Sequence, residues 1–158
     1  MFNSAFTQLL PLVALGALLI VAAVIDVRTF TISNRLNLTV AALAPIYWLT
    51  ISLSPWPGVA IQLAAAATVF LVLAGAFYAG MMGGGDVKLA AALALWFPPQ
   101  SLLQFIVYMS IAAGLVTLVV LVVHRSREAK GRPQIPYGLA IAYGGLAILA
   151  QPYLNHFA

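Results

Sequence analysis

The chain has 158 residues, of which 64% are hydrophobic and only 6% charged, and its formal net charge is +4. This composition excludes an ordinary water-soluble domain, and the lack of cysteine excludes disulfides and thiolate zinc sites. We therefore expect one integral-membrane domain over residues 1–158, an all-α helix bundle embedded in the lipid bilayer.

Six apolar segments, each bounded by polar or turn-forming residues, are predicted to cross the membrane as helices. In chain order they cover residues 6–26, 36–53, 59–80, 86–97, 101–123 and 135–152. The fourth is short, because a helix over 86–97 rises only about 18 Å against a hydrocarbon core of roughly 30 Å. We expect this helix to begin below the cytoplasmic surface, after the glycine run 83–85. A tight turn at the surface is the alternative.

The positive charges indicate the orientation of the bundle. Every basic residue falls in or near the first, third or fifth connection between the predicted segments: Arg28, Arg35, Lys88, Arg125, Arg127, Lys130 and Arg132. The positive-inside rule places these connections in the cytoplasm and both termini outside. We interpret the basic residues as topology signals, so no nucleic-acid partner is expected. Trp48, Trp56 and Trp96 then fall at the outer interface, where indole rings are favoured.

The chain has three carboxylates, and two of them adjoin predicted membrane segments. Asp26 ends the first segment and Asp86 begins the fourth, so both are expected on the cytoplasmic side. Acidic groups at such positions are costly and are functional by default. We expect Asp86 to lie in a small wet pocket, since irregular backbone at that depth has to line a cavity or be covered by protein. Glu128, in the basic fifth connection, is interpreted as a solvated counter-charge.

Two carboxylates within hydrogen-bonding reach share a proton, because both do not ionise easily. The ionised member can take a proton from water while the neutral member polarises a peptide carbonyl, which hydrolyses an amide without a covalent intermediate. Asp26 lies at the carboxyl end of a helix and Asp86 at an amino end, so we expect Asp26 to hold the proton and Asp86 to act as the base. No metal or other cofactor is expected.

Two other functions remain open from the residues alone. The same carboxylates could bind cations in a small ion- or proton-coupled transporter. Alternatively, the chain could be a non-catalytic assembly subunit of a pilus or secretion machine. Lys88 could bind substrate or stabilise developing charge, or it could extend to the membrane surface as a topology residue.

Three motifs carry a resemblance to a known family. The first is Asp26-Val27-Arg28 followed by Ile32-Ser33-Asn34, the second is Gly83-Gly84-Gly85-Asp86-Val87-Lys88-Leu89, and the third begins Ile135-Pro136-Tyr137-Gly138. Together and in this order they resemble the prepilin peptidases, aspartic proteases of the Gly-x-Gly-Asp type. Ser33 departs from the pattern, because the family usually has proline there.

The resemblance implies that Asp26 and Asp86 form the catalytic pair. It makes Gly83, Gly84, Gly85 and Lys88 a supporting loop, and it gives a role in substrate contact or packing to Asn34, Pro136, Tyr137 and Gly138. Glycines of the last segment, Gly144 and Gly145 among them, are expected to let it pack closely on the catalytic segments.

The implied substrate is a type IV prepilin or pseudopilin, cut at the cytoplasmic face of the bacterial inner membrane while its apolar helix lies among the spans. Larger family members carry Cys-x-x-Cys pairs linked to N-methylation. Because this chain has no cysteine, it is similar to the small peptidase-only form found with tight-adherence (Flp-type) pili, and no N-methyltransferase activity is expected.

Overall fold

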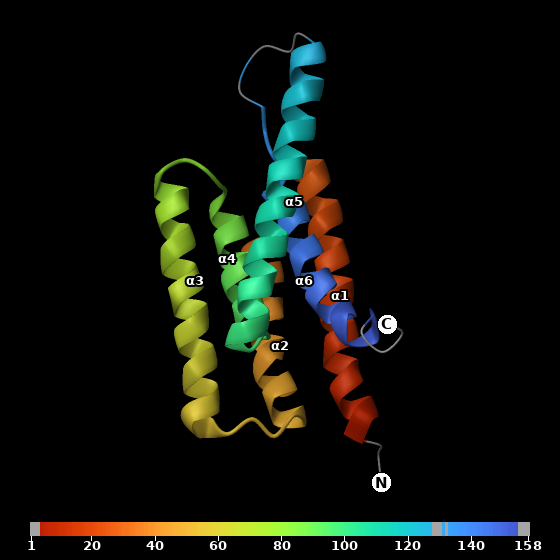
Figure 1. Cartoon of the computed structure of the whole chain (residues 1–158), viewed down its shortest axis with the longest axis vertical. Coiled ribbons are helices and arrows are strands. Elements are labelled where there is room, and N and C mark those ends of the chain that lie inside the picture. The colour runs from red at the N-terminus through yellow and green to blue at the C-terminus, as the bar shows by residue number, and fades with distance from the viewer. Residues whose placement is uncertain (1–3, 128–130, 132, 155–158) are drawn as a thin grey trace.

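A computed structural model describes residues 4–127, 131 and 133–154, and within these residues the regular structure is helical. Figure 1 shows the helices in chain order: α1 (Ser4–Thr29), α2 (Asn34–Thr50), α3 (Ala60–Tyr78), α4 (Gly84–Ala94), α5 (Pro99–Ser126) and α6 (Tyr137–Leu154). A short π-helical segment, η1 (Pro55–Val59), kinked at Trp56, leads into α3. Each predicted segment coincides with one helix, and the all-α prediction is confirmed. The main differences lie at the polar ends, where α1 and α5 each continue about one turn beyond the apolar run.

Successive helices run in alternating directions, so α4 begins at the end of the bundle where α1 finishes (Figure 1). Asp26 in the last turn of α1 and Asp86 in the first turn of α4 therefore lie at the same end of the molecule. The short fourth segment is confirmed: α4 has 11 residues, or about 16 Å of helix. Figure 1 shows that α4 stops short of the lower ends of its neighbours α2 and α3.

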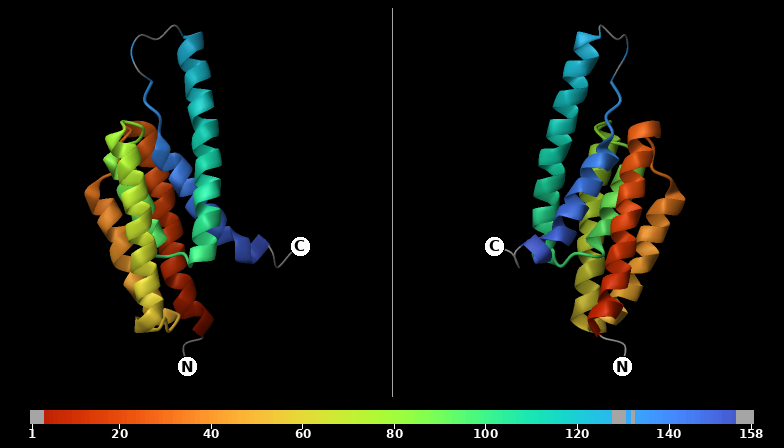
Figure 2. Two further views of the ribbon diagram at one scale, coloured as in Figure 1. Left: turned by 60° about the vertical axis from the view of Figure 1, so that its left-hand side comes forward. Right: turned by 90° about the vertical axis from the view of Figure 1, so that its right-hand side faces the viewer.

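Two groups of helices meet in the core. The short α4 packs between α2 and α3, whereas α6 packs on α1 and on α5. Figure 2 shows α5 standing apart from the α1–α4 group with α6 as its nearest companion. The close approach of α6 depends on two glycines, as the sequence predicted. A Cβ at Gly144 would lie 3.1 Å from the backbone nitrogen of Met109, and one at Gly145 would lie 2.8 Å from Leu19 Cδ1.

Two of the three tryptophans differ from the prediction of rings facing lipid headgroups. Trp48 and Trp96 are only 9% and 3% exposed, and their indole nitrogens donate to the carbonyls of Leu95 and Val40 at 2.9 and 3.0 Å. The two bonds join α2 to the end of α4. Trp48 pairs with a carbonyl that the early end of α4 leaves free, whereas Trp96, just beyond α4, reaches back to a carbonyl within α2. Trp56 is exposed, as a residue facing a headgroup region would be.

Three helical stretches among the described residues are long and apolar enough to cross a membrane: Phe6–Thr29, Pro55–Tyr78 and Pro99–Ser126. Their outward faces are exposed and apolar, with Val13 and Ile20 on α1 and Leu71 on α3 as examples. Such faces are expected where the surrounding solvent is lipid, since no water has to be accommodated there. The chain is thus an α-helical protein of membrane type.

Candidate active site

Asp26 is buried near the end of α1 and is held by the start of α6. It is 2% exposed, and its Oδ2 accepts a hydrogen bond of 3.2 Å from the backbone N–H of Leu139. The helix ends one turn later, where Phe30 takes a positive φ of 52° and its N–H donates to the Asp26 carbonyl at 2.8 Å. This sharp end turns the chain back across the carboxylate instead of away from it.

Gly138 lies directly on the Asp26 carboxyl. A Cβ at this position would approach Asp26 Cγ to 2.8 Å and Oδ2 to 2.9 Å, and it would collide with Ile32 Cδ1. No residue larger than glycine fits while α6 delivers its first N–H groups to Asp26. Pro136, two residues before Gly138, is buried as well. The third sequence motif therefore lies against the first.

Asp86 occupies the first turn of α4 and caps that helix. It is 8% exposed, and its Oδ2 accepts a 3.2 Å hydrogen bond from the backbone N–H of Gly83. This bond uses one of the N–H groups that a helix start leaves unpaired. Asp26 also accepts from the first turn of a helix, because α6 begins beside it. Asp26 was expected to hold the proton because it lies at the carboxyl end of α1. Since it also lies at the amino end of α6, the helix dipoles do not distinguish the two carboxylates.

Ile32 connects the two aspartate segments, although they are far apart in the chain. Its side chain meets Gly138 beside Asp26, and its carbonyl oxygen is 2.7 Å from where a Cβ on Gly85 would lie. In addition, Asn37 Nδ2 donates to the Gly85 carbonyl at 2.9 Å. Gly85 is thus required for the close approach of the glycine run to the connection between α1 and α2.

Sequence reasoning missed Asn37. It is buried in α2, a helix of otherwise mainly apolar residues, and it holds the backbone beside Asp86. Its position one turn after Asn34 was the available signal, because a buried amide in an apolar helix requires partners.

The contacts of Ile32 with Gly138 and with Gly85 bring the two carboxylate segments together. Asp86 opens to a cavity of about 260 Å³ at the same end of the bundle. The other residues around this cavity come from three connecting segments: Phe30, Gly80, Met81, Met82, Gly83, Pro133, Gln134, Ile135 and Tyr137. A pair of buried carboxylates with one member facing a cavity is suited to acid–base chemistry on a bound molecule.

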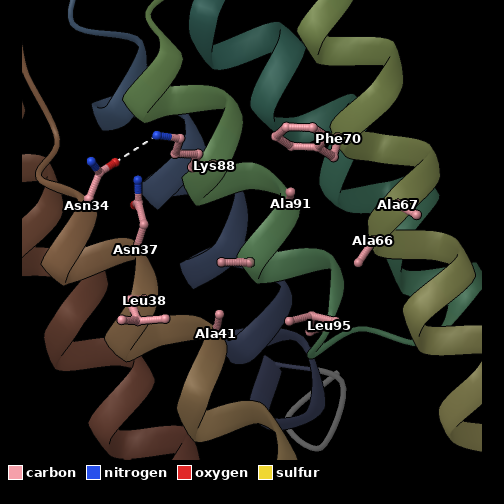
Figure 3. A pocket seen from close by; sticks show the side chains of 11 residues that line it. Asn34, Asn37, Leu38, Ala41, Ala66, Ala67, Phe70, Lys88, Ala91 and Leu95 are labelled. Atoms are coloured by element: carbon pink, nitrogen blue, oxygen red, sulfur yellow. Dashed lines mark hydrogen bonds between the residues drawn. The ribbon is translucent and has the colours of Figure 1, made fainter.

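Lys88 points away from this cavity. It is exposed, and its Nζ donates to Asn34 Oδ1 at 2.8 Å. Both residues stand at one end of a groove of about 530 Å³, which lies between α2 and α3 with α4 as its floor (Figure 3). The predicted supporting role of Lys88 therefore concerns this groove, while Gly83 and Tyr137 are at the Asp86 cavity.

Comparison with known protein families identifies the relationship. The model of the type IV leader peptidase family matches residues 13–118, which is more than half of the chain. The chain belongs to this family. The matched stretch contains both Asp26 and Asp86, whereas the segment around Gly138 lies beyond it. Membership implies aspartic-type prepilin peptidase activity. Neither the curated proteins nor the solved structures gave a significant match.

Proposed function

We propose that this protein is an aspartic endopeptidase that removes the leader peptide of type IV prepilins or pseudopilins of the Flp type. It acts at the cytoplasmic face of the inner membrane, and Asp26 and Asp86 together activate the attacking water. The observation that carries the proposal is that two buried carboxylates from distant segments lie at one end of the bundle, with Ile32 packed between their supporting glycines. Membership of the type IV leader peptidase family supports it.

The proposed mechanism follows from the shared environment of the pair. One carboxylate is ionised and removes a proton from water, and the other is neutral and donates a hydrogen bond to the scissile carbonyl. The tetrahedral intermediate then collapses as a proton passes to the leaving amine. The N–H groups of Leu139 and Gly83 hold one oxygen of each carboxylate, which leaves the other oxygens for water and substrate.

The test is cleavage of a co-expressed prepilin, followed by the gel shift that loss of the leader causes. Asp26→Asn and Asp86→Asn are each expected to abolish cleavage while the protein still inserts into the membrane. Glu128→Gln is the matched control, since Glu128, outside the described residues, is the third carboxylate of the chain. Normal processing by either aspartate variant would refute the dyad, and it would favour a transporter or an assembly subunit.

We also propose that all six helices cross the membrane, with the aspartate end in the cytoplasm. The described basic residues at helix ends support this orientation: Arg28, Arg35, Lys88, Arg125 and Arg127 belong to the end of the bundle that holds Asp26 and Asp86. A cysteine replacing Ser126 is expected to react only with reagents from the cytoplasmic side, and one replacing Ser54 only from outside. The reverse pattern would refute the orientation.

A further inference from the structure

A second cavity adjoins the Asp86 cavity. It has about 280 Å³ and lies between α3 and α5, with α6 beneath it. Its walls are mainly apolar: Leu73, Ala76, Met109, Ser110, Ala113 and Ile141. Figure 2 shows α5 leaning away from the group that contains α3, so the cavity faces the side on which these helices are not packed together.

Met81, Met82 and Tyr137 line both this cavity and the one at Asp86. The two cavities therefore adjoin at these three side chains. The cavity at Asp86 is the more polar, and we call the apolar cavity between α3 and α5 the α3–α5 groove. Neither the 530 Å³ groove on α4 nor the 390 Å³ groove lined by Ala112 and Tyr143 shares a lining residue with the Asp86 cavity.

We infer that the α3–α5 groove binds the apolar helix of the prepilin on the mature side of the cleaved bond. The inference rests on the proposed function and adds the binding surface. A substrate chain whose scissile bond lies at Asp86 extends away from that bond in both directions. The α3–α5 groove is the apolar surface next to the Asp86 cavity that can bind one of the two directions. Ala76 and Ala113 on the facing helices allow close approach of another helix. The methionines at the junction adapt to different side chains.

The size and exposure of the groove fit a laterally entering helix. The cavity is too small to enclose a helix, so it receives one face of the substrate helix while the other face stays in lipid. Ser110 is exposed and Ala113 half-buried, so the α5 wall is reachable from the bilayer. A substrate helix already anchored in the membrane can then reach Asp86 without leaving the lipid.

Neighbouring alanines on α5 provide a matched test. Ala113 lines the α3–α5 groove, and Ala112 lines the groove on the opposite side of the α5–α6 pair; both are half-buried. In reconstituted vesicles, Ala113→Trp is expected to raise KM for full-length prepilin about tenfold or more, because it fills the groove. Ala112→Trp is expected to leave KM within about twofold of wild type. Equal KM values for the two variants would overturn the inference.

Photocrosslinking provides a readout that does not depend on activity. A benzophenone amino acid replaces Ala113 or Ala112 in the Asp86→Asn protein, which we expect to bind prepilin without cutting it. We expect crosslinks from position 113, and not from 112, to the apolar helix of the prepilin. Crosslinks from 113 only to lipid or to a second copy of this chain would overturn the groove assignment. Cleavage by Asp86→Asn itself would instead contradict the proposed function, so the two failures are distinguishable.

Discussion

Replacing Gly138 by alanine tests whether Asp26 has to stay where α6 holds it. The new Cβ would lie 2.8 Å from Asp26 Cγ, and ordinary contacts begin near 3.4 Å, so the carboxyl has to move by about 0.6 Å. A displacement of about 1 Å at a catalytic group can lower the rate 100-fold. We therefore expect Gly138→Ala to reduce kcat/KM for prepilin cleavage by about 10- to 100-fold. Overpacking is also expected to lower the free energy of unfolding by about 1–3 kcal/mol.

Gly16→Ala is the control for this substitution. Gly16 also lies where α1 meets α6, but the nearest atom to its Cβ would be Leu146 Cδ2 at 3.9 Å, an ordinary contact. The assay is the initial rate of leader removal in vesicles with equal amounts of folded enzyme. Cleavage by Gly138→Ala at the rate of Gly16→Ala would refute the claim that the Asp26 position limits the rate.

A double variant separates the two collisions at Gly138. Ile32 Cδ1 is the atom closest to the added Cβ, and valine lacks that atom. Ile32→Val combined with Gly138→Ala is therefore expected to recover stability, measured as the midpoint of thermal unfolding in detergent. Cleavage should stay low, because the contact with Asp26 persists. Recovery of both properties would show that the collision with Ile32 alone explains the loss.

Two further predictions concern the backbone that holds Asp86. Gly80 has a φ of 71° and open space around its Cβ position, so Gly80→Ala is expected to cost about 1–2 kcal/mol of stability through the backbone alone. Gly75→Ala, in α3 with equally open space, should stabilise by about 0.5–1 kcal/mol, and the order of the two unfolding midpoints checks both. Asn37→Ala removes the partner of the Gly85 carbonyl and is expected to cost about 1–3 kcal/mol. It should also slow cleavage, and wild-type rates would show that this hydrogen bond does not position Asp86.

The helices could be predicted from the sequence because their signal is local. Runs of apolar residues interrupted by prolines, glycines and charges give helix positions directly, and the double proline 98–99 with the glycine run 83–85 delimits a short α4. The common end for Asp26 and Asp86 followed from alternation of the helices and the distribution of positive charge. These arguments require no knowledge of which helices touch.

The site itself depends on contacts between helices, and here sequence reasoning was incomplete. The N–H of Leu139 reaches Asp26 only because α6 crosses α1, so the dipole reasoning could not include it. For the same reason the indoles of Trp48 and Trp96 were expected at the lipid interface, whereas they are buried and donate to the carbonyls of Leu95, at the end of α4, and Val40, within α2. A pattern of residue types indicates polarity and spacing but not which donor meets which acceptor.

The contacts of Ile32 support the proposed approach of the substrate from the side of α3 and α5. Its backbone lies against Gly85 and its side chain against Gly138, so the connection between α1 and α2 closes one side of the aspartate pair. Ile32 is itself buried, and Asn37 supports the same side from α2. Asp86 nevertheless lines an open cavity, and Met82 and Tyr137 are among its other lining residues. A closed side with fixed hydrogen bonds and an open side with adaptable methionines is the arrangement that a peptidase of membrane-anchored substrates requires, since the acids must stay still while different helices bind.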